Sequence, residues 1–562
     1  MLHSEAKQKW GMALAVMGLL LPFADKAFHI DDPLFVWTAR QILRHPFDFY
    51  GFSLNWNGLV EPAYRIIQNP PLNGYLIAAA AAFFGETEIA VHAGMSLAAL
   101  AAVFGVYRLA RQLTQSPAWT ALFAAATPAF WISATGAMAD VPLLALYVWA
   151  LALWIEALAE DRPGKAMAAG GLAALACLTK YFGLTLVPLM AFHALATGKF
   201  KPRWLAGLLL PLAAVAGYQL LTWFLYGRAL FFDAASYTLG FAGGRGGIVS
   251  RALQCLAFVG GGLAGLIFLA PLLHRGRVLA VGGAFAAALV MLAFGLESNG
   301  VIEVGALSGL SGSVRLQFWI LAAAGAYLIG MATAEASNRR DAASLTLLLA
   351  VYGTFFFAAY LNWTINARII LPMAPAVAVL LLGRTPLKAA AMRPTATAMA
   401  LALAVLFSLP FCLADYRFAG NQRRAAADLH QTLSHRHASI WFQGHWGFQY
   451  YMQQKGARPL DYDDTVIRAN DIVVVPSNNT LTTALPPDAF HVAGTLRYAG
   501  FSWAATMNSD VGAGFYAAEW GPLPYAVGLS PPDRFTVYLA GRFENPESAV
   551  TPLARLLSEA SR

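Results

Sequence analysis

Repeated apolar runs, each close to the length of a membrane-spanning helix, are the feature that most constrains this sequence. A helix needs roughly 20 mostly apolar residues to cross a bilayer. Only 12% of the residues are charged and 58% are hydrophobic, whereas soluble domains carry about 25% and 45–50%. The chain is therefore predicted to be an α-helical polytopic membrane protein with about thirteen spans, at residues 10–28, 90–107, 117–135, 141–159, 166–180, 182–197, 204–226, 251–273, 278–296, 316–334, 342–361, 370–383 and 395–413.

The basic residues indicate the direction in which the spans run. Lys and Arg cluster in alternate connecting segments, beginning with Lys7 and Lys9 ahead of the first run, which is interpreted as a retained signal anchor. Because cytoplasmic loops are enriched in Lys and Arg, the N-terminus is predicted to be cytoplasmic and the C-terminus extracytoplasmic. The net charge of +8 is spread over these clusters, which argues against a nucleic-acid partner.

Two parts of the chain lack the apolar length of a span. Residues 29–87 are rich in Pro and aromatic residues, with helical periodicity in Leu34–Leu43 and Leu72–Phe84, and are predicted to form an extracytoplasmic loop with interfacial helices. The last part contains strand-like runs and turn signals. The predicted domains are a transmembrane catalytic domain at 1–413 and a soluble extracytoplasmic α/β domain at 414–562.

Three carboxylates are the strongest candidates for chemistry. Asp31 and Asp32 follow the first run, and Asp140 lies between the third and fourth runs on the same predicted side. One of them could act as a general base toward an acceptor hydroxyl. The alternative is a helix cap, because Asp is favoured at N-cap positions and Pro33 and Pro142 suit the first turn.

Several isolated cations are predicted on the same side of the membrane. Lys180 and Arg368 lie at the outer ends of spans, where they could bind a lipid phosphate. A lysine that snorkels to the interface is the alternative for Lys180. Arg65 and Arg245 are further outer-face cations, and the glycines around Arg245 form either a loop that closes over a ligand or a flexible linker. The sequence contains neither the zinc-protease motif H-E-x-x-H nor a P-loop.

Five short motifs occur in the order found in one enzyme family. They are Asp31-Asp32-Pro33, Asn69-Pro-Pro-Leu-Asn-Gly-Tyr75, Ala139-Asp140-Val-Pro142, Gly171–Lys180 and Arg368-Ile-Ile-Leu-Pro372. Over residues 10–385 the chain resembles GT-C glycosyltransferases, and most nearly glycosyltransferase family 39, with protein O-mannosyltransferases and the aminoarabinose transferase of lipid A as relatives. It departs from the family at Gln68-Asn69, where relatives often carry a Glu-Lys pair.

This resemblance implies a GT-C fold, a polyprenyl-phosphate sugar donor and an inverting transfer in an extracytoplasmic cavity. Carried over by position, Asp31 is the expected base with Asp32 beside it, and Asp140 is a second acidic site residue. The resemblance allows a divalent metal ion at Asp140, and no other cofactor is expected. Lys180 and Arg368 would face the lipid phosphate, with Arg65, Arg245 and Asn69 as further candidates for substrate binding.

The predicted function is therefore a polyprenyl-phosphate-sugar-dependent glycosyltransferase of the cell envelope, in a bacterial inner membrane. The acceptor, whether a glycan, a lipid or a protein, is not specified by the sequence. Two other classes remain open at this point. One is a transporter or flippase of lipid-linked saccharides, and the other is a non-enzymatic membrane scaffold. Transporters usually carry polar, broken helices at mid-membrane depth, and here the charged residues gather at the ends of the spans.

Overall fold

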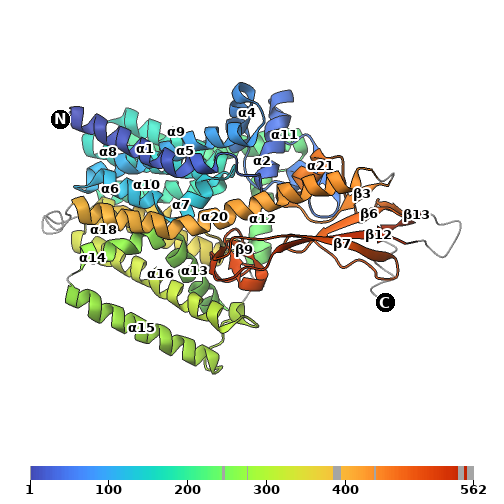
Figure 1. The fold of residues 1–562 in the computed structure, drawn as a ribbon. Helices are drawn as coiled ribbons and strands as arrows, with labels where there is room; N and C mark the ends of the chain where they lie inside the picture. Colours follow the sequence, from blue (N-terminus) through green and yellow to red (C-terminus); the bar gives the residue numbers. More distant parts are fainter. Residues whose placement is uncertain are drawn as a thin grey trace.

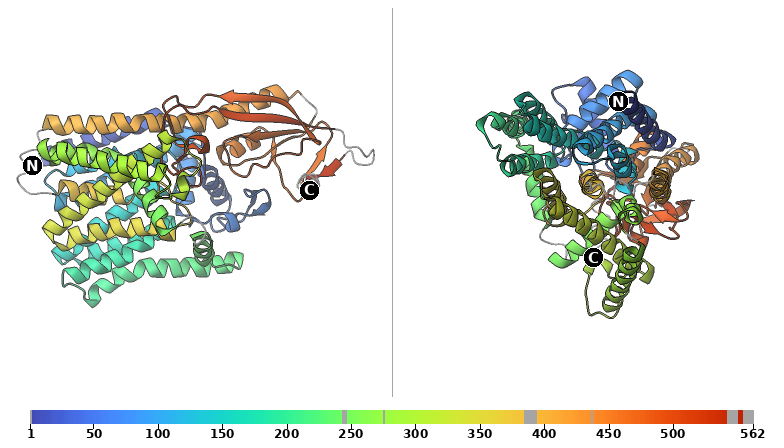
Figure 2. Two further views of the ribbon diagram at one scale, coloured as in Figure 1. Left: turned by 90° about the horizontal axis from the view of Figure 1, so that it is seen from below. Right: turned by 90° about the vertical axis from the view of Figure 1, so that its left-hand side faces the viewer.

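The apolar runs form a bundle of long helices, and a β-sheet lies beyond one end of the bundle (Figure 1). The computed structural model describes residues 2–242, 247–274, 276–383, 394–435, 438–541 and 550–553. Viewed along the bundle, most of its helices are seen end on (Figure 2). The helical axes therefore run roughly parallel, as they must if the bundle crosses a bilayer.

Each of the thirteen predicted runs overlaps a helical segment. These helices are α1 (Leu2–Leu20), α5 (Glu88–Leu113), α6 (Pro117–Ala125), α7 (Pro128–Ala134), α8 (Asp140–Glu160), α9 (Pro163–Thr179), α10 (Leu186–Ala196), α11 (Pro202–Tyr226), α13 (Ile248–Gly262), α14 (Ala270–Leu273), α15 (Gly276–Ser298), α16 (Gly312–Arg339), α17 (Ala342–Phe356), α18 (Met373–Leu382) and α20 (Pro394–Leu433). Among the described residues, seven helices are long and apolar enough to span a membrane, or eight if the pair of helices bent at residue 263 counts as one span. The predicted class, a multi-pass helical membrane protein, is confirmed.

Close contacts between helices depend on small residues. A Cβ atom on Gly260 of α13 would lie 1.8 Å from the carbonyl oxygen of Leu321 on α16. A Cβ on Gly325 of α16 would lie 2.1 Å from the carbonyl oxygen of Leu256. Both distances are far shorter than any real contact, so only glycine allows the two backbones to meet. Small residues serve this purpose in membrane bundles, where lipid cannot drive helices together by the hydrophobic effect.

The end of the bundle remote from the sheet carries paired charges. Arg108 is 2.7 Å from Glu156, Lys165 is 2.9 Å from the same carboxylate, and Arg111 is 2.7 Å from Glu5. The N-terminus lies at this end (Figure 1). The arrangement gathers the predicted cytoplasmic basic residues on one side of the bundle and leaves the opposite end for the sheet and the candidate site.

The segment between α1 and α5 folds over the sheet end of the bundle. It contains α2 (Asp32–Arg44), β1 (Ser53–Asn55), β2 (Val60–Pro62), α3 (Ala63–Ile66) and α4 (Leu72–Phe84). The helical periodicity in Leu34–Leu43 and Leu72–Phe84 thus corresponds to α2 and α4. These two helices pack closely, because a Cβ on Gly74 would lie 2.7 Å from the Thr38 methyl group.

Residues 438–541, called the tail below, contain a five-stranded mixed sheet in the order β4-β3-β6-β12-β7. β3 is parallel to β4 and β6, and β12 is antiparallel to β6 and β7. The strands of this sheet are β3 (Ile440–Phe442), β4 (Arg458–Pro459), β6 (Ile472–Pro476), β7 (Phe490–Tyr498) and β12 (Asp533–Ala540). Short ladders are formed by β5 (Val466–Arg468) with β13 (Val550–Pro552), β8 (Ala504–Ala505) with β11 (Ala526–Val527), and β9 (Met507–Asn508) with β10 (Ala513–Gly514).

One long helix joins the bundle to the tail. α20 runs from Pro394 to Leu433, so the predicted domain boundary at 413/414 falls inside it. Figure 2 shows α20 running along the bundle with the sheet beyond its end. α21 (Trp446–Gln454) packs between α20 and the sheet, where the rings of Phe448 and Phe535 are 5.0 Å apart. The tail is thereby held at a fixed position relative to the bundle.

The stretch of tail between β7 and β12 returns to the bundle. The amide of Ala367 donates to the carbonyl of Phe515, and the amide of Ala518 donates to the carbonyl of Ile365, both at 2.9 Å. Tyr525 stacks on Phe411 of α20 with ring centroids 3.6 Å apart. Tail residues 506–520 therefore lie beside the segment that carries Arg368.

Candidate active site

The turn between α1 and α2 separates the two adjacent aspartates. Ile30 has a positive φ of 50°, which is a strained backbone conformation for a β-branched residue. Asp31 occupies the N-cap position of α2, yet its side chain makes no capping hydrogen bond. Asp31 points toward a cavity, whereas Asp32 is fully buried and points the other way. The geometry brings only Asp31 of this pair into the candidate site.

Two cations and two carboxylates meet beside this cavity, which Asp31 and Arg368 of this cluster line. Lys180 Nζ is 2.7 Å from Asp140 Oδ1. Arg368 lies 3.5 Å from Asp140 and 3.6 Å from Asp31. Asp140 is the first residue of α8 but makes no capping bond, since its carboxylate is used by Lys180 and Arg368. Four residues from four separate motifs are thus brought together.

Arg368 is the residue that connects the parts of the cluster. Its guanidinium stacks over the ring of Tyr516 at 5.1 Å and contacts the sulfur of Met138. Its Nε–H is buried and has no hydrogen-bond partner among the described residues. A buried donor without a partner is costly. Arg368 therefore has one guanidinium donor that the described residues do not use.

The cavity in front of Asp31 and Arg368 has a volume of about 430 Å³, and it is called the active-site pocket below. The loop residues Arg65 and Asn69 also line it, so four of the predicted residues share one pocket. The tail supplies one wall, which sequence reasoning did not anticipate. This wall includes Trp446, Thr480, Leu481, Tyr516, Glu519 and Trp520.

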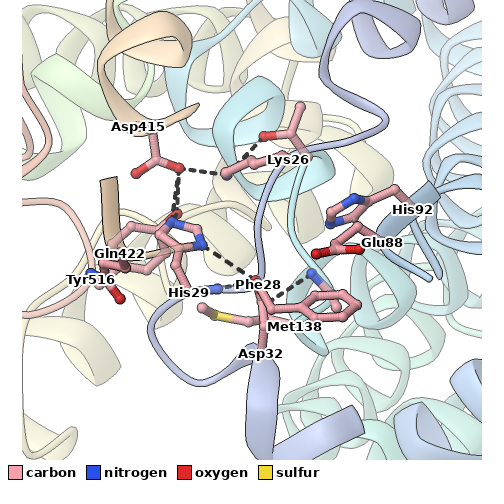
Figure 3. A network of polar contacts seen from close by, with 12 residues as sticks. Lys26, Phe28, His29, Asp32, Glu88, His92, Met138, Asp415, Gln422 and Tyr516 are labelled. Carbon is pink, nitrogen blue, oxygen red and sulfur yellow. Dashed lines mark hydrogen bonds and ion pairs between the residues drawn. The ribbon is translucent and has the colours of Figure 1, made fainter. Parts of the chain in front are cut away.

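A buried charge network stands behind the pocket. Figure 3 shows the imidazole of His29 between the carboxylates of Asp32 and Asp415, with Lys26 on Asp415. Lys26 Nζ is 2.6 Å from Asp415 Oδ2, and the Tyr516 hydroxyl donates to the same oxygen at 2.8 Å. All five side chains are buried. The network ties the turn before α2, α20 and the tail together at one point.

Asp32 has a clear structural part in this network. Its Oδ1 accepts from the amide of Ala137 at 2.8 Å, and its Oδ2 accepts from the amide of His29 at 3.1 Å. Asp32 thus positions the Ala137 loop that leads to Asp140, and it fixes the turn that carries Asp31. Asp32 does not line the pocket, so we expect it to position these segments.

The electrostatic environment sets the two aspartates apart. Burial raises the pKa of Asp31 above its usual value, although the positive charge of Arg368 opposes this. Burial also acts to raise the pKa of Asp32, but the hydrogen bond and charge of His29 prevail and lower that pKa. Burial and Lys26 oppose protonation of His29, yet the carboxylates of Asp415 and Asp32 raise its pKa. The buried network is therefore charge-balanced, whereas Asp31 retains an affinity for protons that suits a general base.

The site does not fit a divalent metal ion at Asp140. Both carboxylate oxygens of Asp140 face cations, Lys180 and Arg368. No cluster of three or more His, Cys, Asp or Glu side chains suited to a metal occurs among the described residues. A metal ion beside Asp140 would meet two positive charges. No chemical step is therefore assigned to a metal.

Arg245, a further predicted substrate-binding residue, lies outside the described residues.

The residues missed by the sequence analysis gave little local signal. Lys26 and Asp415 are 389 positions apart; Lys26 lies near the end of the first apolar run, and Asp415 follows the last one. Tyr516, Glu519 and Trp520 stand in a stretch of short ladders without regular periodicity. Only the folded chain shows that these residues surround Arg368.

Comparison with known proteins agrees with the motifs. A sequence profile of the family described as dolichyl-phosphate-mannose-protein mannosyltransferase matches residues 68–226. No curated protein matches the chain. Among solved structures, ArnT from Cupriavidus metallidurans bound to undecaprenyl phosphate is 14% identical, with a TM-score of 0.44 over 84% of this chain and 93% of that chain. An oligosaccharyltransferase from Archaeoglobus fulgidus, in complex with Zn and sulfate, is 15% identical, with a TM-score of 0.42 over 81% of this chain and 62% of that chain.

The profile match includes the segment that carries Asp140 and Lys180. It confirms, over residues 68–226, the glycosyltransferase resemblance that the motifs indicate.

Proposed function

We propose that this protein transfers a sugar from a polyprenyl-phosphate carrier to an acceptor at the extracytoplasmic face of a bacterial inner membrane. The N-terminus is then cytoplasmic and the tail lies outside. A sugar on a lipid phosphate already carries a good leaving group, so no nucleotide is needed on that side. The family match over residues 68–226 and the cluster of Asp31, Asp140, Lys180 and Arg368 support this proposal.

The observation that carries the proposal is the arrangement around Arg368. A cation with one buried donor unused lines a pocket that also contains a half-buried carboxylate, Asp31. Departure of a phosphate develops negative charge, and a positioned guanidinium stabilises it. Asp140 contacts both Lys180 and Arg368, and it therefore holds the two cations close together beside the pocket that Arg368 lines.

Asp31 acts as the general base in this proposal. Its side chain is 37% exposed, so an acceptor hydroxyl can reach it from the pocket. The carboxylate takes the hydroxyl proton while the oxygen attacks the anomeric carbon, and the bond to the phosphate breaks. Direct displacement of this kind inverts the anomeric centre. A covalent sugar–enzyme intermediate would instead retain it.

The proposal is tested with purified protein and labelled polyprenyl-phosphate sugars, using a cell-envelope extract as the source of acceptors. The wild-type protein should release polyprenyl phosphate and form a labelled product. Arg368→Met should abolish this, whereas Arg315→Met, which removes an arginine paired with Glu297 at 2.7 Å, should retain it. Absence of donor turnover by the folded wild-type protein, or equal activity of both variants, would refute the proposal. The anomeric configuration of the product tests inversion.

A further inference from the structure

The outward face of the tail sheet carries a second cavity, called the sheet pocket below. Its volume is about 380 Å³. It is formed by β6, β7, β12 and the loop that follows β6, and its lining residues include Ser477, Thr482, Thr483, Thr495, Arg497, Arg534, Thr536 and Tyr538. The sheet projects away from the bundle (Figure 1), and the sheet pocket has no lining residue in common with the active-site pocket.

Two arginines lie directly opposite each other in this pocket. Arg534 of β12 is paired in register with Arg497 of β7. Like charges directly opposite on neighbouring strands are destabilising. Neither guanidinium has an ion-pair or hydrogen-bond partner among the residues that the structure describes, and no Asp or Glu lines the pocket. The fold therefore maintains a concentrated positive charge that its own side chains do not neutralise.

Hydroxyl groups surround the two arginines. Thr495 and Thr536 form the next cross-strand pair on the same face, with their hydroxyl oxygens 3.5 Å apart. The amide of Arg534 donates to the Ser477 hydroxyl at 3.2 Å, which fixes this serine at the edge of the pair. Thr482, Thr483 and Tyr538 complete the lining. Such groups donate and accept hydrogen bonds, as the hydroxyls of a saccharide do.

We propose that the sheet pocket binds a phosphorylated saccharide. A phosphate monoester carries close to two negative charges at neutral pH, which matches the two guanidinium groups in number. Arginine binds phosphate through paired N–H donors. The threonine and serine hydroxyls are placed to bind the sugar ring. The apolar lining is limited to Val475, Pro476 and Ala484, which leaves little surface for an acyl chain.

Neighbouring residues of one loop line the two pockets. Thr480 and Leu481 line the active-site pocket, and the next two residues, Thr482 and Thr483, line the sheet pocket. A bound saccharide would therefore contact the loop that borders Asp31's cavity. The sheet pocket would thereby take part in acceptor recognition. This role rests on the proposed function, whereas the binding of a phosphorylated saccharide does not.

The test is calorimetric titration of the full-length protein in detergent with glucose 6-phosphate, glucose and inorganic phosphate. Glucose 6-phosphate should bind, and each arginine lost should weaken binding about tenfold or more, because hydrogen bonds to charged groups are the strong ones. Arg497→Gln/Arg534→Gln is the key variant. Arg458→Gln/Arg468→Gln makes the same charge change on exposed tail residues outside both pockets and is the matched control.

The outcomes are distinct. Loss of glucose 6-phosphate binding in the pocket variant alone supports the site. Equal affinity in both double variants, or equal binding of glucose and glucose 6-phosphate, overturns it. Inorganic phosphate that binds as tightly as glucose 6-phosphate would reduce the pocket to an adventitious anion site and also overturn it. A thermal unfolding curve that matches the wild type excludes misfolding. Because no transfer is measured, the result is independent of the proposed function.

Discussion

Replacing Lys26 by methionine removes one charge from the buried network and leaves its partner in place. Lys26 Nζ is 2.6 Å from Asp415 Oδ2, and both side chains are at most 1% exposed. Breaking a buried ion pair on one side costs about 3–5 kcal/mol. His29, Tyr516 and Thr506 still contact Asp415, so the lower end of that range applies. The lost hydrogen bond to Thr135 adds about 1 kcal/mol.

We therefore expect Lys26→Met to lower the free energy of unfolding by about 3–4 kcal/mol. Denaturant unfolding of the detergent-solubilised protein, followed by tryptophan fluorescence, measures this change. Arg228→Met is the matched control, because the Arg228–Asp233 pair is exposed and exposed pairs contribute little. A loss below about 1 kcal/mol for Lys26→Met would refute the reasoning, since a surface pair would explain it equally well.

Four further predictions follow. Gly260→Ala should destabilise the bundle by about 1–3 kcal/mol through overpacking, whereas Gly330→Ala, with open space at its Cβ, should be neutral or stabilising by denaturant unfolding. Burial raises the pKa of Asp533 from 3.8 to about 6, so the folded protein favours the protonated carboxyl. The free energy of unfolding should therefore fall by about 3 kcal/mol as the pH rises from about 4 to above 6. Asp533→Asn should flatten that part of the stability–pH profile. Because the pKa of Asp31 is raised, acidification should slow transfer at a higher pH than it would if the base were an ordinary aspartate. A pH–rate profile without this decrease on the acidic side would contradict the assignment of Asp31 as the base. Tyr516→Phe should lower the free energy of unfolding by about 1 kcal/mol and retain most sugar transfer, because the ring under Arg368 remains. Tyr516→Ala should lower stability further and lose transfer in the same assays.

Much of the fold follows from composition and periodicity. The apolar runs overlap the bundle helices, and the periodic stretches at 34–43 and 72–84 correspond to α2 and α4. These features depend on local sequence and on the bilayer as solvent. Tertiary packing decides the rest, because some runs form short or broken helices, such as α6 followed by α7.

The candidate site was predictable in part. Asp31, Asp140 and Lys180 lie at the ends of helices and Arg368 lies in the turn before α18, where charge is otherwise costly, and the fold brings them together. The divergence of the Asp31 and Asp32 side chains was not predictable, since it depends on distant partners: Arg368 lies beside Asp31, and the amide of Ala137 donates to Asp32. The contribution of the tail was hidden for a related reason. Its contacts with Arg368 join segments 148 positions apart, from Arg368 to Tyr516, and no local pattern marks such a pair.

The central claim is that Asp31 is the base that activates the acceptor. Single-turnover transfer from a labelled polyprenyl-phosphate sugar, compared between the wild type, Asp31→Asn and the exposed control Asp25→Asn, tests it most directly. Asp31→Asn should slow transfer about 10²–10⁴-fold while donor binding and unfolding remain unchanged, and Asp25→Asn should transfer normally. Near-normal transfer by Asp31→Asn would contradict the account.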